Sequence, residues 1–370
     1  MSVTVATVAR LVAELAPPEW AESWDNVGLL LGAPQEPVRR VLVALEATDA
    51  VVAEAVAEGA DLLLLHHPII FHPLKHLRLE GAANQRLHRL FAGNIAVCAA
   101  HTNFDVAPGG TNDVLAETLG LQAPQVLDPT GTEKRFKLVT FVPPSHADAV
   151  RDAMAATGAG VIGNYTHCSF QSPGTGTFRP GPGAQPYIGH TGHLEKTEEL
   201  RLEVLVPERL SQAAVAALRA AHPYEDVAYD LYPLANPGSV RGHGRAGRLA
   251  APITLQELAG RVKAALGVEA VGVAGDPARR IGTVAVGAGA GGSLVAAAAA
   301  AGAEVLVTGD ISHHTAHDAL DAGLCLIDPG HWATEVIAMP GLVRYLEQRL
   351  DGSGVAVALA RAQDPPLRVW

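Results

Sequence analysis

The sequence predicts an α/β protein in which a duplicated α/β metal-binding domain, formed by the N- and C-terminal segments, carries an inserted α+β domain. First, apolar runs of strand length alternate with helical patterns toward both ends of the chain. Second, the two ends resemble each other in sequence. Third, the middle of the chain has a different texture, with its own order of strands and helices. These features predict domains at residues 1–127, 128–245 and 246–370.

The N-terminal segment alternates strands and helices. Residues 39–48 (RRVLVALEAT) form an apolar run, residues 49–60 have helical spacing that ends at a glycine, and residues 61–68 (DLLLLHHP) form a second run. Residues 82–94 predict a further helix and residues 95–101 (IAVCAAH) a third strand. Such alternation favours parallel pairing within one sheet.

The C-terminal segment repeats this plan. Strands are expected at residues 281–290, 304–310 and 324–335, with helices at 293–303 and 314–323. The run EGADLLLLHH resembles AGAEVLVTGD, and AVCAAHTNFD resembles LCLIDPGHWATE. An internal duplication explains these matches, although two short alignments in an alanine-rich chain also arise by chance.

The middle segment predicts a domain with its own core. Its order is β-α-β-β-α-β, the split ferredoxin-like pattern. Strands are expected at residues 137–144, 160–172, 198–207 and 227–234, helices at 146–158 and 211–223, and a Gly/Pro-rich loop at 172–192.

Composition argues against several classes of partner. The 370 residues carry a net charge of −11, which disfavours nucleic acid and anionic membranes as partners. The N-terminal residues 1–20 read as an amphipathic helix, not as a signal peptide. The apolar residues 293–307 are rich in alanine and broken by glycine, which suits a packed helix and strand better than a membrane span.

The cysteines indicate a reducing compartment. Cys98, Cys168 and Cys325 form no CxxC motif and cannot all pair, so we expect a cytoplasmic protein. Cys98 and Cys325 occupy matching places in two predicted strands, which suggests small buried side chains without a redox role.

Histidine and acidic residues gather where predicted strands end, and in open α/β sheets ligands bind at that edge. The clusters are His66-His67, His101 to Asp105, Asp310 to His314, and His331 to Glu335. A single His at a strand end is more often a surface or hydrogen-bonded residue than a ligand. Together, however, four such clusters favour a cation. Burying them without one would leave polar groups unpaired, at a total cost of roughly several kcal/mol.

Imidazole and carboxylate groups are ligands for divalent transition metals, and a shared carboxylate holds two ions roughly 3.5–4 Å apart. His331 and Glu335 are spaced i and i+4, so a helix starting there presents both on one face. In the segment SWDNVGLLLG, Asp25 and Asn26 are either substrate contacts or turn residues, with Trp24 then filling the core. The run Thr111-Asn112-Asp113, which follows Pro108-Gly109-Gly110, is expected to form an ordinary helix N-cap.

Five motifs, in this order, carry a family resemblance: SWDNVGLLLG, LLLHHPIIFHPLKHL, AAHTNFDVAPGGTND, VTGDISHH and IDPGHWATE. The chain resembles the NGG-one-interacting-factor-three-like family, whose bacterial members are labelled GTP cyclohydrolase I type 2 homologues. The middle segment, with GTGTFRPGPGAQPYIG and AHPYEDVAYDLYPL, is similar to the PII- or CutA-like domain of the longer members.

The resemblance implies a dinuclear metal centre in a toroidal homohexamer. It implies His66, His67, Asp105, His331 and Glu335 as metal ligands, with Glu335 bridging. It places His101, Asp310, His313 and His314 in the second shell or facing substrate. The two divalent ions would be Zn, Mn, Fe, Co or Ni.

Two functions follow as hypotheses. One is a metal-dependent hydrolase acting on a nucleotide or phosphoester-like substrate, with His101 or His314 moving protons. The alternative is a non-enzymatic metal-handling or regulatory assembly whose insert senses a small ligand.

Overall fold

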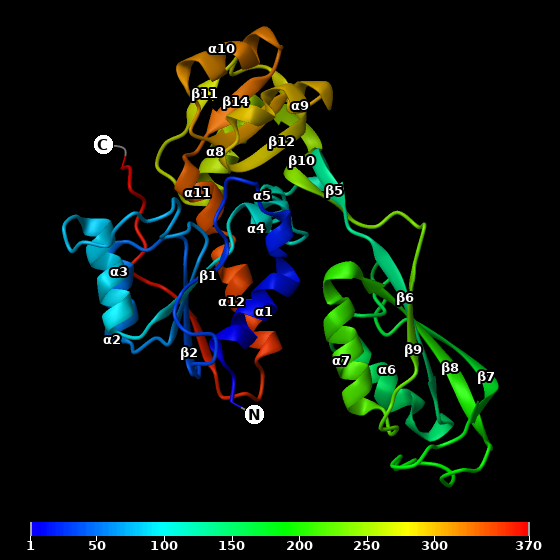
Figure 1. The fold of residues 1–370 in the computed structure, drawn as a ribbon. Coiled ribbons are helices and arrows are strands. Elements are labelled where there is room, and N and C mark those ends of the chain that lie inside the picture. Colours follow the sequence, from blue (N-terminus) through cyan, green and yellow to red (C-terminus); the bar gives the residue numbers. More distant parts are fainter. Residues whose placement is uncertain (1, 369–370) are drawn as a thin grey trace. The chain divides into compact units, whose positions relative to one another are not determined.

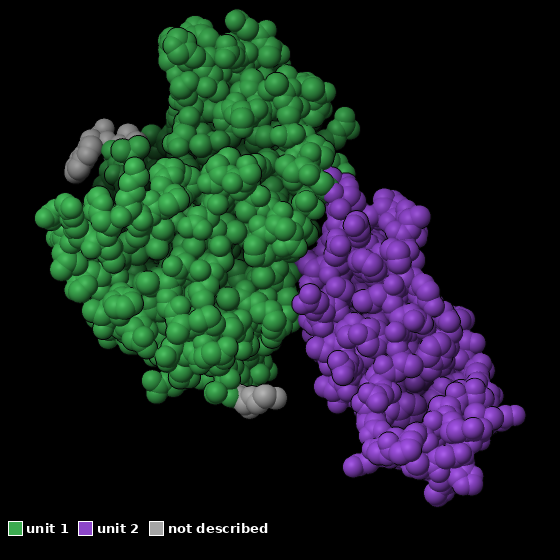
Figure 2. All heavy atoms as spheres, viewed as in Figure 1, with its two compact units in different colours: residues 1–131, 241–370 green, residues 132–240 purple. Residues whose placement is uncertain are grey.

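A computed structural model describes residues 2–368, which form two compact units. One unit joins the chain up to Gly131 with the chain from Arg241 onward, and the other spans Thr132–Val240 (Figure 2). The sequence predicted the insert at 128–245. The fold is mixed α/β with several sheets.

The first sheet of the larger unit lies in the order β1-β4-β3-β2-β15. Its strands are β1 (Gly28–Leu31), β2 (Arg40–Ala44), β3 (Leu62–Leu65), β4 (Ala96–Ala99) and β15 (Ala356–Leu359). β1 is antiparallel to β4, and the other pairs are parallel. All four leucines of β3 are fully buried, as expected for a strand covered on both faces.

Helices cover both faces of this sheet (Figure 1). On one face the core includes residues of α1 (Val5–Leu15) and α12 (Met339–Arg349). On the other it includes residues of α2 (Asp49–Ala57) and α3 (Ala82–Ala92). Because α12 and β15 come from the far end of the chain, the C-terminal segment completes the N-terminal sheet, which the sequence analysis did not predict.

The second sheet lies in the order β11-β14-β13-β12-β10-β5. Its strands are β5 (Gln122–Thr132), β10 (Val240–Thr254), β11 (Gly272–Ala274), β12 (Arg280–Ala290), β13 (Val305–Gly309) and β14 (Cys325–Asp328). β12, β13 and β14 are parallel. α5 (Thr111–Thr118) and α8 (Leu255–Leu266) contribute to the core on one face, and α9 (Val295–Ala300) and α10 (His313–Asp321) on the other.

The cysteines in the two sheets of the larger unit are buried as predicted. Cys98 in β4 and Cys325 in β14 are each 1% exposed. Burial raises the pKa of the Cys98 thiol to about 12, so that side chain stays a protonated, unreactive thiol near neutral pH.

The smaller unit has the predicted order of elements: β6 (Arg135–Val142), α6 (Ala147–Ala155), β7 (Ser169–Phe178), β8 (Glu195–Pro207), α7 (Ser211–Ala221) and β9 (Tyr229–Pro233). Its antiparallel sheet runs β7-β8-β6-β9, with α6 and α7 packed into the core with the sheet. The prediction of a loop from residue 172 was wrong, because β7 continues to Phe178. As an edge strand, β7 accommodates Pro173, which has no N–H to donate.

Within residues 2–368, the structure contains no helix with the length and apolar character needed to cross a membrane.

Candidate metal centre

The predicted ligands lie just beyond the carboxyl ends of parallel strands from both sheets of the larger unit. His66 and His67 directly follow β3, and His101 follows β4 by two residues. His331 follows β14 and begins α11 (His331–Val336). The two sheet edges meet at this point, because Nε2 of His67 lies 3.4 Å from Nε2 of His331.

Three groups of side chains converge closely enough to hold a cation. In each group the ligand atoms all lie within 4.8 Å of one another. The groups are His66–Asp105–Glu335, His67–His331–Glu335 and His66–His67–His101. All the ligands expected from the sequence fall in these groups. They also include His101, which had been expected outside the coordination shell.

Glu335 lies at the middle of the cluster and is 3% exposed. One turn of α11 places it beside His331, whose Nε2 is 3.0 Å from the Oε2 atom of Glu335. The same oxygen is 3.0 Å from Nε2 of His67, and Oε1 is 3.7 Å from Nε2 of His66. Although burial opposes ionisation, the neighbouring His331 and His66 imidazoles hold the pKa of Glu335 well below its usual value.

His66 is fully buried and oriented by the backbone. Its Nδ1 lies 2.8 Å from the Ala100 carbonyl oxygen, an acceptor, so Nδ1 carries the proton and Nε2 faces the cluster. Nε2 is 3.6 Å from Oδ1 of Asp105, beyond a good hydrogen bond. Among the described side chains, Nε2 of His66 and Oε2 of Glu335 are buried without any hydrogen-bond partner of proper geometry.

These separations suit a shared cation. Ligand atoms roughly 2.0–2.2 Å from a tetrahedral ion lie about 3.4 Å apart. The observed distances of 3.0, 3.4, 3.6 and 3.7 Å lie around that value. The groups therefore point at common positions between them and not directly at one another.

The charge balance of the cluster also favours a cation. Burial opposes protonation of His66, but the charges of Asp105 and Glu335 raise its pKa to about 9. The close contact with the Glu335 carboxylate, with further help from Asp310, raises the pKa of His331 to about 9 against the effect of burial. Protons on these rings thus supply the positive charge that a metal ion would otherwise bring.

Two carboxylates outside the cluster orient its imidazoles. Asp25 accepts a hydrogen bond from Nδ1 of His101 at 2.8 Å and from the Thr102 hydroxyl at 2.5 Å. Despite partial burial, these bonds lower the pKa of Asp25 to about 2. Asp310 accepts from Nδ1 of His331 at 2.7 Å. Such partners fix the tautomer that leaves Nε2 free to bind metal.

Asp310 holds this position with a left-handed backbone, at φ +57°. That conformation is costly for a residue other than glycine, and such strain concentrates at functional sites. In this structure it accompanies the hydrogen bond from Asp310 to His331.

Other predicted residues lie apart from the ligand atoms. Asn26 donates to the Ile70 carbonyl at 2.6 Å. Trp24 is 57% exposed, so the suggestion that it fills the core was wrong. It lies instead against the rings of Phe71 and His101.

His313 and His314 are exposed on α10. Their ring contacts are with each other and between His313 and His317. The candidate metal groups found within residues 2–368 leave both of them out. Their role near substrate stays a prediction.

Three residues that shape the centre were not among the predicted site residues. Thr111 was expected to cap α5, but Gly110 holds the cap position and the Thr111 hydroxyl donates to Oδ1 of Asp105 at 2.5 Å. A Cβ at Gly289 would lie 2.2 Å from Oε1 of Glu335, and one at Gly309 would lie 2.5 Å from the backbone nitrogen of His331. The glycine-rich run VGAGAGG at 286–292 was the available signal.

The fold and this cluster define a class: mixed α/β proteins in which parallel strands of two mixed sheets direct histidines and carboxylates toward one candidate metal centre. The model of the family described as Duf34/NIF3 (NGG1p interacting factor 3) matches residues 3–366. The chain belongs to the Duf34/NIF3 family.

Relatives and a solved structure agree with this membership. The chain is 46% identical to the GTP cyclohydrolase 1 type 2 homolog of Halalkalibacterium halodurans, over 93% of this chain and 92% of that protein. It is 42% identical to the Bacillus subtilis protein of the same name, over 93% and 92%. A Bacillus cereus protein related to NIF3 superposes with a TM-score of 0.81 at 40% identity, covering 100% of both chains.

Proposed function

We propose that this chain binds two divalent metal ions and acts as a metal-dependent hydrolase on a nucleotide or phosphoester-like substrate. His66 and Asp105 would hold one ion and His67 and His331 the other, with Glu335 shared between them. The observation that carries the proposal is that Nε2 of His66 and Oε2 of Glu335 are buried without a hydrogen bond of proper geometry, within ligand groups spaced for a cation. The name of the relatives, GTP cyclohydrolase 1 type 2 homolog, supports ring-opening hydrolysis as one form of the activity.

When bound, such an ion pair lowers the pKa of water and stabilises charge on an attacked centre. The protein's own contribution is position and proton transfer. His101 faces the His66 and His67 rings and is held by the ionised Asp25. We propose that His101 exchanges protons with substrate or orients it. These contacts favour His101 over His314, which lies on exposed α10.

The finer architecture also belongs to this proposal. The sheet order β7-β8-β6-β9 supports kinship of the insert with PII- and CutA-like domains. Three parallel strands, β2-β3-β4 and β12-β13-β14, recur in the two sheets and support an internal duplication. Assembly into a homohexamer and a cytoplasmic location stay predictions.

Turnover tests the hydrolase directly. Metal-loaded protein is assayed against a panel of nucleotides and phosphoesters beside the Glu335→Ala variant, with product release followed by chromatography. We expect hydrolysis of at least one compound and its loss in the variant. Equal turnover by both proteins would identify a contaminant. No turnover by either would favour the non-enzymatic alternative of metal handling.

The Asp25→Asn substitution tests how His101 is held. The amide keeps the shape of the side chain but removes its charge and presents an N–H on one side, so the His101 tautomer is no longer fixed. We expect metal affinity or turnover to fall by about 10- to 100-fold, the usual effect of an outer carboxylate. Competition with a chromogenic chelator measures the affinity. The control is Asp321→Asn on exposed α10, which should change neither property.

A further inference from the structure

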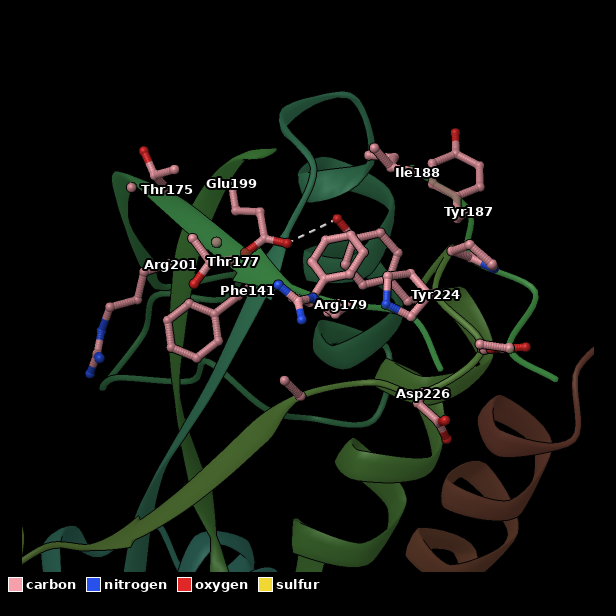
Figure 3. Close-up of a pocket in the computed structure, with 18 of the residues that line it drawn as sticks. Phe141, Thr175, Thr177, Arg179, Tyr187, Ile188, Glu199, Arg201, Tyr224 and Asp226 are labelled. Carbon is pink, nitrogen blue, oxygen red and sulfur yellow. Dashed lines mark hydrogen bonds between the residues drawn. The ribbon is translucent and has the colours of Figure 1, made fainter. Parts of the chain in front are cut away.

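The inserted unit contains a pocket that the metal centre does not use. Its volume is about 750 Å³, which suits a small organic molecule. Its lining includes the aromatic residues Phe178, Tyr187 and Tyr224 and the charged residues Glu199, Arg179, Arg201, Glu225 and Asp226. Figure 3 labels Tyr187, Tyr224, Glu199, Arg179, Arg201 and Asp226. Tyr224 lies with its ring centroid 6.2 Å from that of Tyr187 and 6.3 Å from that of Phe178.

Glu199 places a buried carboxylate in this pocket. The residue is only 8% exposed, and the Tyr224 hydroxyl donates to its Oε1 at 2.9 Å, the contact drawn in Figure 3. Burial and the hydrogen bond to Glu199 raise the pKa of the Tyr224 phenol well above its usual value, so the phenol remains a neutral donor. Within residues 2–368, no Lys, Arg or His nitrogen forms an ion pair with Glu199.

The backbone is adapted to this carboxylate. A Cβ on Gly176 would lie 2.1 Å from Oε2 of Glu199, so only glycine at that place in β7 leaves room for the side chain. A buried carboxylate whose hydrogen-bonded partner is neutral is costly unless a positive group completes it. The Glu199 carboxylate therefore lacks a cationic partner in this pocket.

Of the two arginines that line the pocket, Arg201 is engaged by neighbouring side chains and Arg179 is not. Arg201 is engaged, with its Nε 2.7 Å from Glu203 and its guanidinium 6.0 Å from the centre of the Phe141 ring. Arg179 is exposed and takes part in none of the hydrogen bonds or ion pairs within the described chain. Arg179 is thus available to an anionic group.

We propose that the insert binds a small zwitterion of aromatic amino-acid chemistry, whose ammonium pairs with Glu199, whose carboxylate pairs with Arg179 and whose ring packs among Phe178, Tyr187 and Tyr224. Cations are attracted to aromatic faces, which adds to the attraction of Glu199 for the ammonium. This site lies entirely within residues 132–240 and uses none of the candidate metal ligands.

Calorimetry on the full chain tests the proposal with three probes. L-Tryptophan carries both charges, tryptamine lacks the carboxylate, and indole-3-propionate lacks the ammonium. We expect L-tryptophan to bind at one site per chain and each of the other two to bind about ten-fold more weakly, because each loses one charged contact. Failure of L-tryptophan to bind at millimolar concentration would overturn the proposal.

Substitutions assign each contact. Glu199→Gln should weaken the binding of L-tryptophan and of tryptamine about ten-fold and leave the binding of indole-3-propionate unchanged. Arg179→Gln should weaken the binding of L-tryptophan and of indole-3-propionate and leave the binding of tryptamine unchanged. Glu198→Gln, which neighbours Glu199 in β8 but is exposed and outside the pocket lining, is the matched control and should bind L-tryptophan like the parent. Unchanged binding in Glu199→Gln would overturn the proposal. The Glu335→Ala variant should still bind L-tryptophan, which separates this site from the metal centre.

Discussion

Replacing Glu335 by alanine is expected to remove both divalent ions from the protein. This carboxylate approaches His66, His67 and His331 and belongs to two of the three candidate metal groups. Its loss leaves each of these two groups with two ligands, fewer than a stable site needs. Elemental analysis of protein purified without chelator should fall from close to two ions per chain to nearly none.

His313→Ala is the control for this experiment. Its side chain is exposed on α10 and lies outside the candidate groups, so the variant should keep the metal content of the parent. Equal loss of metal in both variants would contradict the ranking of ligands. Retention of both ions by Glu335→Ala would rule out a bridging role for that residue.

The second large effect is expected from Gly289→Ala. Gly289 has φ +67°, and an added Cβ would lie 2.2 Å from Oε1 of Glu335. The substitution therefore combines left-handed strain with displacement of a buried ligand. We expect a loss of about 2–4 kcal/mol in the free energy of unfolding. Metal content should fall as well, because Glu335 must move.

Gly302→Ala separates strain from displacement. Gly302 has φ +71° in the turn after α9, but its added Cβ meets no atom within 4 Å. We expect the free energy of unfolding to fall by about 1–2 kcal/mol and the metal content to stay at the level of the parent. Denaturant titration and elemental analysis measure the two quantities for both variants. If Gly289→Ala lowers the free energy of unfolding no more than Gly302→Ala does and keeps its metal, the close fit between Gly289 and Glu335 does not matter for stability or metal binding.

Local sequence patterns were sufficient to predict the strands that carry the candidate metal ligands. The leucines of β3 are buried on both faces, and a polar pair directly follows them, so the sequence marks both the strand and its end. For β14 the predicted strand over residues 324–335 ran too far, because the strand ends at Asp328 and α11 begins at His331. A shared edge of parallel strands then brings such residues together without knowledge of any particular contact.

Contacts between distant segments were not predictable from local patterns. β15 pairs with β2 although more than 300 residues separate their sequences, and nothing within residues 356–359 specifies that partner. His101 joins the ligand groups because Asp25, 76 residues earlier, fixes its ring. The need for glycine at 289 likewise arises from a side chain on α11, which no reading of residues 286–292 alone reveals.

The most direct test of the dinuclear centre is anomalous diffraction from crystals of protein loaded with zinc or manganese, recorded at the absorption edge of the metal. Two anomalous peaks roughly 3.5–4 Å apart, both touching Glu335, are the expected result. One peak should also contact His66 and Asp105, and the other His67 and His331. Density for solvent alone among these side chains would contradict the proposed metal centre.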